Sequence, residues 1–196
     1  MKNKIVMVVG TSLFGRYQDK PLMYRTYALL SEQYDSISHQ CKNLEHLPAS
    51  ERSNSKYDSD IRHIKDVMQL LYLPVAEEKC CKEALILSKL QDISEVVLVA
   101  TDSVLSVVAC ELLKEYITNL GIKCIFNNNI SATDTTIAIG VTTKNIVTEN
   151  IERILDKHLT KDSYLVCSTF DSVQIFLARK YENVMLSLHN EQLYEL

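Results

Sequence analysis

The sequence predicts an α/β protein with a Rossmann-like, mostly parallel sheet and helices on both of its faces. Two observations support this prediction. Short apolar runs at 4–9 and 95–100 are rich in valine, which is typical of strands buried on both faces of a parallel sheet. The second run is followed by a polar turn, a segment with helical period and another strand-like run at 122–126. Together these segments indicate a βαβ unit.

The first run ends at Gly10, and no convincing strand follows before residue 91. Apolar residues recur at helical spacing instead, which predicts helices at 25–32, 58–73 and 76–90. The second of these carries an apolar stripe made of Ile61, Ile64, Val67, Met68 and Leu71. We therefore expect one domain, residues 1–196, with a helical insert at about 18–91.

After the second run, a helix is predicted at 104–120, with Gly121 as the residue that stops it. Its polar residues, which we expect to face water, are Glu111, Lys114, Glu115 and Asn119. An irregular region is expected at 127–140. The helix predicted at 143–158 could pack on a second subunit or simply cover the sheet. Beyond it, the pattern predicts strands at 163–167 and 183–188, a helix at 172–180 and a short edge strand at 192–195.

Composition excludes several classes of protein. The net charge of −4 argues against a protein that holds long nucleic acid by neutralising many phosphates. The apolar runs are far shorter than the roughly 20 residues that cross a bilayer, so no membrane span is expected, and the basic start lacks a cleavage site, which favours a cytoplasmic protein. The six cysteines form no CxxC pair and are expected to be reduced core thiols, and no spacing of cysteine and histidine indicates a metal or another cofactor.

Familiar nucleotide and hydrolase motifs are missing. The first strand is not followed by GxGxxG, the chain has no GxxxxGK[ST], and Ser12 is not part of a GxSxG elbow. These absences count against a dinucleotide-dependent oxidoreductase, a P-loop enzyme and an esterase.

Two polar turns at strand ends are the candidate ligand site. Ligands of open α/β sheets bind beyond the carboxyl ends of the strands, where Gly10-Thr11-Ser12 and Thr101-Asp102-Ser103 are expected to lie. Hydroxyls, backbone amides and a helix N-terminus can hold phosphate or ribose there. The alternative is that Asp102 or Ser103 only caps the following helix. Arg16 and Lys20 are nearby cations that could contact phosphate or simply face solvent.

These residues resemble a known pattern. Two segments are similar to the CRISPR-associated Rossmann-fold (CARF) domains. The first is Val8-Val9-Gly10-Thr11-Ser12-Leu13. The second runs from Leu98 to Ile117 and contains Thr101-Asp102-Ser103, followed by residues in the order alanine, acidic, leucine, leucine. The similarity is greatest to the branch of small stand-alone proteins that includes ring nucleases. It follows most of the chain in order and is sharp over these two segments.

The resemblance implies a homodimer that binds a cyclic oligoadenylate, usually the tetra-adenylate, in a cleft across both subunits. Ring nucleases of this family cut without metal, by placing a ribose 2′-hydroxyl in line with the neighbouring phosphate. Carried over to this chain, together with the nearby Arg16, the resemblance gives Ser12 as the candidate catalytic residue and the following as ligand-binding residues: Gly10, Thr11, Ser12, Leu13, Arg16, Thr101, Asp102, Ser103, Ser168 and Thr169.

One family feature is absent. In the family, a turn of the type Asn-x-Thr-Gly-Gly-Phe-Lys follows a late strand, and its lysine contacts the scissile phosphate. The corresponding residues here are Ser168-Thr169-Phe170-Asp171-Ser172, with neither glycine nor lysine. This departure counts against catalysis and leaves binding intact; Arg16, Lys20 or Lys144 could take the place of the lysine.

The expected function is binding of a cyclic oligoadenylate in type III CRISPR antiviral defence, with metal-independent cleavage of the ring as a further step. A first alternative is a non-catalytic sensor that binds the ring and regulates a partner protein. A second alternative, of a different class, is an enzyme that processes a nucleotide or sugar phosphate on a related fold, because fold alone does not fix function.

Overall fold

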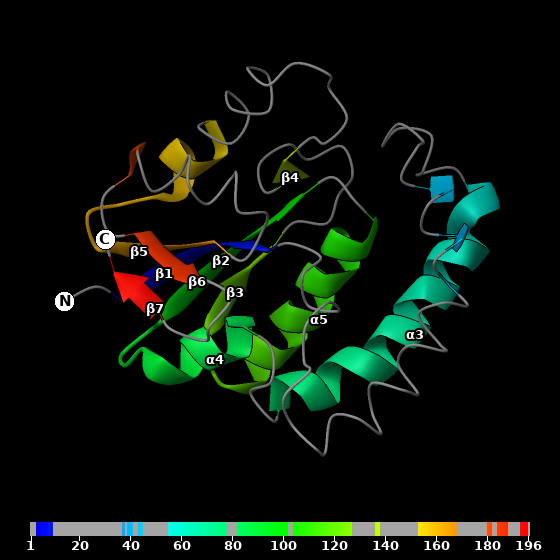
Figure 1. Ribbon diagram of the computed structural model, residues 1–196, viewed down its shortest axis with the longest axis horizontal. Helices are drawn as coiled ribbons and strands as arrows, with labels where there is room; N and C mark the ends of the chain where they lie inside the picture. The colour runs from blue at the N-terminus through cyan, green and yellow to red at the C-terminus, as the bar shows by residue number, and fades with distance from the viewer. Residues whose placement is uncertain are drawn as a thin grey trace.

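The computed structural model describes residues 3–9, 37, 39–40, 43–44, 55–77, 82–101, 104–126, 136–137, 153–167, 180–181, 184–187 and 193–195. Within them a seven-stranded sheet lies at the centre of the molecule (Figure 1). Its strands are β1 (Lys4–Val9), β2 (Glu95–Thr101), β3 (Lys123–Ile125), β4 (Thr136–Ile137), β5 (Ser163–Cys167), β6 (Val184–Ser187) and β7 (Leu193–Glu195).

The strand order is β3-β2-β1-β5-β6-β7, and β4 pairs with β2. All neighbouring strands run parallel except β6 and β7, which are antiparallel. The predicted α/β, Rossmann-like and mostly parallel sheet is therefore confirmed, as are the strand positions at 4–9, 95–100 and 163–167. The run at 192–195 contains β7, which ends one side of the described sheet, as expected of an edge strand.

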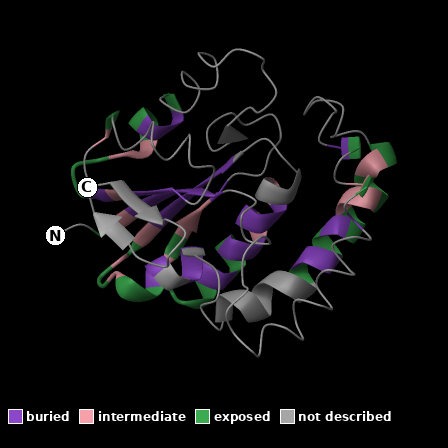
Figure 2. Ribbon diagram, viewed as in Figure 1, coloured by how far each residue is buried: buried purple, intermediate pink, exposed green. Residues whose placement is uncertain are grey.

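Strand β1 occupies the centre because its side chains are apolar on both faces. Ile5 and Met7 face one core and Val6 and Val8 face the other, and all four are completely buried (Figure 2). Full burial of one such side chain contributes roughly 1.5–3 kcal/mol. The alternation follows the two-residue period of a strand, so each face of the sheet needs its own cover.

Helices cover the first face in two layers. Helices α4 (Lys82–Lys89) and α5 (Val104–Asn119) share one apolar core with the β1 and β2 side chains of that face, and α3 (Asp58–Glu77) packs on α5 (Figure 1). Because α5 lies between the sheet and α3, it is buried on more than one side. Its completely or almost completely buried residues include Val108, Ala109, Cys110, Leu112, Leu113 and Ile117.

A helical segment at 153–158 covers the second face. Ile154 and Leu155 are buried against Val6, Val8 and the β2 and β5 side chains of that face. For these residues the structure favours the expectation of a sheet-covering helix, and residues 143–152 lie outside the described part of the chain. The helix expected at 25–32 lies outside it as well. Of the helix expected at 172–180, only Lys180 is described, and it is helical.

The expected helix boundary near Pro74 is wrong. We expected helices at 58–73 and 76–90, but α3 continues through Pro74 to Glu77. The described part of the second helix is α4, Lys82–Lys89. A proline removes one backbone hydrogen bond and clashes with the preceding turn. Here it stands three residues before the end of α3, so the helix it disturbs is almost complete. The apolar stripe of α3 is confirmed for Ile64, Val67 and Met68, which are buried.

Two expectations about α5 have different outcomes. Gly121 does stop the helix: its φ is +79°, its N–H donates to the Thr118 carbonyl at 2.9 Å, and the Ile122 N–H donates to the Ile117 carbonyl at 3.3 Å. This pair of bonds is the Schellman motif. The expectation that Glu111 faces water is wrong, because Glu111 forms a 2.6 Å ion pair with Lys65 of α3 and is only 17% exposed.

None of the described helices combines the length and the apolar character that a membrane crossing requires.

Candidate functional site

The carboxyl ends of the three central strands lie at one edge of the sheet, which we call the rim. The rim is defined by Val9 at the end of β1, Thr101 at the end of β2 and Cys167 at the end of β5. Val9 pairs with Ala100, and Val8 pairs with Cys167. The three strands are parallel and in register, so the chain leaves all of them on the same side.

The strand order places the topological switch point between β1 and β5. From β1 the chain goes to β2, β3 and β4 on one side, and later enters β5, β6 and β7 on the other. In open α/β sheets ligands bind at such a point, beyond the carboxyl ends of the two strands. Gly10 follows β1 directly in the sequence and Ser168 follows β5. The sequence predicted the site chiefly at the ends of β1 and β2, and the resemblance added Ser168 and Thr169 after β5; the observed strand order gives β5 equal importance.

Most of the expected site residues lie outside the described part of the chain. These are Gly10, Thr11, Ser12, Leu13, Arg16, Asp102, Ser103, Ser168 and Thr169, together with the cations Lys20 and Lys144. Thr101 is described as the last residue of β2. The structure therefore places the strand ends from which the three expected turns depart.

A helix N-terminus also lies at the rim. Helix α5 begins at Val104, directly after the turn that follows β2, as the sequence predicted. The first backbone N–H groups of a helix have no partner within it, and they carry partial positive charge. Together with the turn, they offer hydrogen-bond donors for phosphate at this edge.

A fourth strand at the rim was not predicted from the sequence. Strand β4 falls within 127–140, where an irregular region was expected, and it pairs with the end of β2 through Thr136 opposite Ala100 and Ile137 opposite Thr101. The run Thr135-Thr136-Ile137-Ala138-Ile139 is rich in β-branched residues. That run was the available signal for a strand, and the surrounding Asn- and Thr-rich composition hid it.

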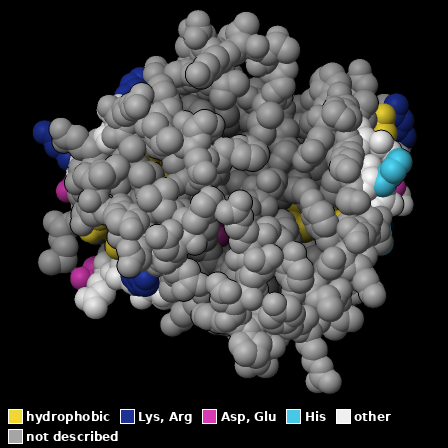
Figure 3. All heavy atoms as spheres, viewed as in Figure 1, with side chains coloured by type: hydrophobic (Ala, Val, Ile, Leu, Met, Phe, Trp, Pro, Cys, Tyr) yellow, Lys and Arg dark blue, Asp and Glu magenta, His cyan; other side chains and the backbone are white. Residues whose placement is uncertain are grey.

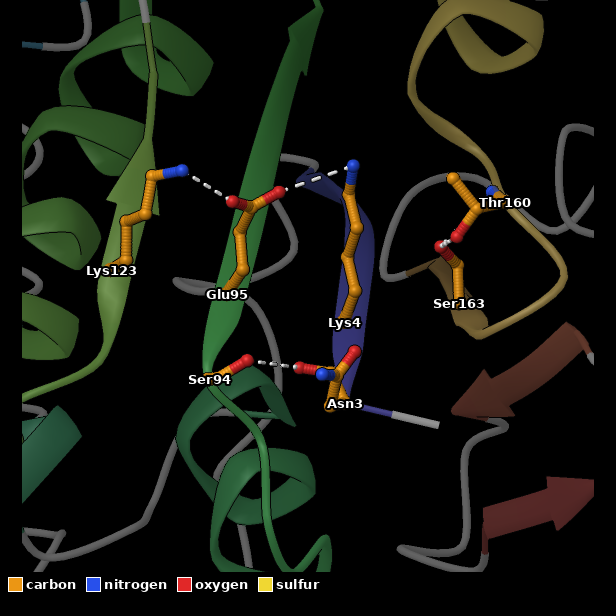
Figure 4. A network of polar contacts seen from close by, with 7 residues as sticks. All are labelled: Asn3, Lys4, Ser94, Glu95, Lys123, Thr160 and Ser163. Atoms are coloured by element: carbon orange, nitrogen blue, oxygen red, sulfur yellow. Dashed lines mark hydrogen bonds and ion pairs between the residues drawn. The ribbon is translucent and has the colours of Figure 1, made fainter. Parts of the chain in front are cut away.

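A polar cluster occupies the opposite edge of the sheet (Figure 4). Glu95, at the start of β2, lies between Lys4 at 3.2 Å and Lys123 at 2.6 Å. The hydrogen bond from Lys123 is the main cause that lowers the pKa of Glu95; partial burial opposes it, and Lys4 adds to the lowering. This cluster joins the amino ends of β1, β2 and β3, so it belongs to the side of the sheet that does not receive ligands in this class of fold.

The described cysteines are suited to packing and not to nucleophilic chemistry. Cys110 and Cys167 are buried, Cys124 is half-buried, and all three are free thiols. Burial is the main cause that raises the pKa of Cys110 well above its ordinary value, and burial raises the pKa of Cys124 to about 12. A thiol with such a pKa is protonated at neutral pH and unreactive. The other cysteines, Cys41, Cys80 and Cys81, lie outside the described residues.

Apart from the Lys4, Glu95 and Lys123 cluster, charged side chains can be followed on one face of the molecule. On the face that Figure 3 shows, the described Lys and Arg side chains lie apart from one another. The described residues also contain no group of three or more His, Cys, Asp and Glu side chains that could hold a metal ion. Within the part of the chain that the structure describes, the rim combines strand ends with the N-terminus of α5, and this is the arrangement that we consider for a ligand.

No protein-family model matches the chain, and no curated protein matches it either.

Proposed function

We propose that this chain binds a cyclic oligoadenylate at the rim, as a CARF-type protein of type III CRISPR defence. The observation that carries the proposal is the register of β1 and β2, in which Val9 lies opposite Ala100. Because of this register, the polar sequences Gly10-Thr11-Ser12-Leu13 and Thr101-Asp102-Ser103 depart from adjacent positions of one edge. These are the two segments that resemble the CARF pattern.

The chemistry of the ligand fits this edge. A cyclic oligoadenylate carries several phosphates and adenines in a small ring, so local amides and hydroxyls can hold it on a protein with a net charge of −4. A ring with rotational symmetry suits a two-fold dimer, in which both copies use the same surface. We therefore propose a homodimer with one ring in a cleft formed by the two rims.

The direct test is binding of cyclic tetra-adenylate, measured by calorimetry in EDTA, with chromatography of the products after prolonged incubation. We expect saturable binding that does not need a divalent metal. Ring opening to linear fragments would assign the protein as a ring nuclease. Stronger binding of AMP than of the ring would instead favour an enzyme that processes nucleotides, and would contradict the proposal.

Variants of the two turns test the location of the site. Loss of one ligand hydrogen bond, especially a charge-assisted one, typically costs about 1.4 kcal/mol, so Ser12→Ala and Asp102→Ala should each weaken ring binding about tenfold. Two matched variants at the opposite edge serve as controls: Ser94→Ala removes a hydroxyl that donates to the Asn3 carbonyl at 3.2 Å, and Asp162→Ala removes an exposed carboxylate. If both turn residues only cap or shape the backbone, stability should fall by about 1 kcal/mol without a change in affinity.

A non-catalytic sensor is the second candidate. It is favoured by the sequence after β5, Ser168-Thr169-Phe170-Asp171-Ser172, which has no lysine to stabilise a developing phosphate charge. Binding without cleavage would identify this function. Ring cleavage that Arg16→Ala, Lys20→Ala or Lys144→Ala abolishes would instead show which cation replaces the family lysine.

A further inference from the structure

Strand β3 ends the described sheet on the side beyond β2. The Lys123 N–H donates to the Ser94 carbonyl at 3.2 Å, so the backbone groups of Lys123 point toward β2. In an extended strand the backbone groups of successive residues point to opposite sides. The N–H and C=O groups of Ile122, Cys124 and Phe126 therefore point away from the sheet, along an outer edge that a further strand could join.

Helix α5 already binds a group on either side of Cys124. The Ile122 N–H donates to the Ile117 carbonyl at 3.3 Å, as part of the motif that ends the helix. The Phe126 carbonyl accepts a hydrogen bond from the Lys114 ammonium at 3.2 Å. Among the described residues, the outward N–H and C=O groups of Cys124 form no hydrogen bond. The open part of the edge is therefore a single residue.

Two copies of this edge are complementary when they pair antiparallel. Around a two-fold axis at Cys124, the N–H and C=O groups of one Cys124 bond to those of the other. The next pair in such a ladder joins the Ile122 N–H of one copy to the Phe126 carbonyl of the other. These groups are the donor and the acceptor that α5 holds. The contacts with α5 therefore confine the ladder to one residue.

Lys114 also places a positive charge at this edge. Its side chain is exposed. Burial raises the pKa of the Cys124 thiol to about 12, and the nearby Lys114 ammonium opposes this rise. A two-fold pairing of β3 strands brings together two copies of this charge and two copies of the exposed Lys123 side chain. Lysine at a strand edge disfavours pairing with another chain, so charge and hydrogen bonding act in the same direction.

We propose that Lys114 guards the outer edge of β3 against pairing with β3 of a second copy. The guard acts independently of the ligand site, because the contacts involved lie on α5, β3 and the residues next to them. Of the two contacts that block the edge, the one from Lys114 is made by a side chain and the one from Ile117 by the backbone. A single substitution at Lys114 therefore opens this interface.

Sedimentation velocity of the full chain without ligand, over a range of concentrations, tests the guard. Lys114→Met removes the donor and the charge, and we expect assemblies larger than those of wild type that grow with concentration. Lys114→Arg keeps a donor and the charge and should sediment like wild type. Lys161→Met, at an exposed lysine in the turn before β5, is the matched control. Wild-type sedimentation of Lys114→Met at every concentration would refute the guard.

A second substitution shows which surface Lys114→Met uses. Cys124→Pro removes the outward N–H, and proline is tolerated on an edge strand where that side faces solvent. Combined with Lys114→Met, it should return the sedimentation to that of wild type. If the double variant associates as strongly as Lys114→Met alone, the new assemblies do not use the β3 edge and the proposal is wrong.

Hydrogen exchange of the wild-type amides tests the open edge whether or not these variants fold. The outward Cys124 N–H should exchange roughly tenfold or more faster than the N–H groups of Lys123 and Ile125, which pair with β2. In Lys114→Met at high concentration, the Cys124 N–H should become protected. Equal protection of all three amides in dilute wild type would mean that the edge is already paired, and would overturn the proposal.

Discussion

Gly121 ends α5 in a conformation that other residues adopt only at a cost. Its φ is +79°, and a Cβ placed there would meet nothing within 4 Å. The cost of a side chain at this position is therefore conformational and not steric. A left-handed residue other than glycine loses roughly 1–2 kcal/mol, part of which is offset because alanine restricts the unfolded chain.

Gly121→Ala should therefore lower the free energy of unfolding by about 1 kcal/mol. Gly121→Asn should lower it less, because asparagine tolerates the left-handed region better. Urea unfolding followed by circular dichroism measures both variants. Equal stability of Gly121→Ala and wild type would show that α5 does not end in this motif in solution.

Glu95 links stability to pH. Its pKa lies below its ordinary value of 4.5, chiefly because Lys123 hydrogen-bonds its carboxylate. Between the lowered and the ordinary pKa the unfolded chain binds more protons than the folded chain, so stability rises with pH in that interval. The contribution of this group is complete above about pH 4.5 and is lost as the pH falls through the folded-state pKa.

Lys123→Met should raise the pKa of Glu95, and NMR titration of the Glu95 carboxyl carbon measures the change. The effect on stability at neutral pH should stay below about 1 kcal/mol, because Lys123 is 68% exposed and such ion pairs are weak. Lys161→Met, at an exposed lysine in the turn before β5, is the control and should leave the Glu95 titration unchanged. A Glu95 titration that Lys123→Met does not move would contradict the contact.

At the scale of elements, α5 is the helix on which the first face of the sheet depends. Leu113 is completely buried in the core that the sheet shares with α3 and α4, while Glu115 on the same helix is exposed. Removing a buried leucine side chain costs about 2–5 kcal/mol through lost transfer energy and the cavity that remains. A substitution at an exposed helix position usually changes the free energy of unfolding by less than about 0.5 kcal/mol.

Leu113→Ala should thus destabilise the protein by 2 kcal/mol or more, approximately the lower end of the range for buried leucines. Glu115→Ala should change stability by less than about 0.5 kcal/mol. Chemical denaturation of the two variants under the same conditions gives the comparison. Similar small losses in both would mean that α5 is not enclosed between the sheet and α3.

Local patterns predicted most of the described elements, and tertiary context explains the exceptions among them. Two strands could be predicted from their own apolar runs, at 4–9 and 95–100, and the end of α5 could be predicted from Gly121. Both kinds of prediction depend on residues that are close together in the sequence. The continuation of α3 past Pro74 and the ion pair of Glu111 depend on packing between helices. Strand β4 forms by pairing with β2, which lies far away in the sequence. The local composition around β4 therefore did not predict it.

At the scale of the whole molecule, the candidate site could be predicted only as a set of turns. The sequence indicates which turns follow strands, and the strand order shows that those after β1, β2 and β5 depart from one edge. Strand order arises from pairing over long sequence distances, which local periodicity does not reveal. The switch point between β1 and β5 could accordingly not be predicted from the sequence.

The proposed two-fold cleft has a stoichiometry that can be measured. We expect one cyclic tetra-adenylate per two chains in calorimetry, and a dimer in sedimentation velocity at the same concentration. An isologous interface with a shared ligand requires both results. One ring per chain, or a monomer that stays monomeric when saturated with ligand, would contradict the shared cleft.

The central position of β1 also has a consequence for synthesis on the ribosome. Lys4 pairs with Glu95 on one side and with Ser163 on the other, so β1 acquires its second neighbour only after the much later strand β5 has been synthesised. Contacts between such distant residues form slowly, and the apolar side chains of β1 stay exposed in the meantime. Nascent chains that stop before β5 should therefore be held by chaperones or aggregate, whereas chains that extend beyond β6 can close the sheet.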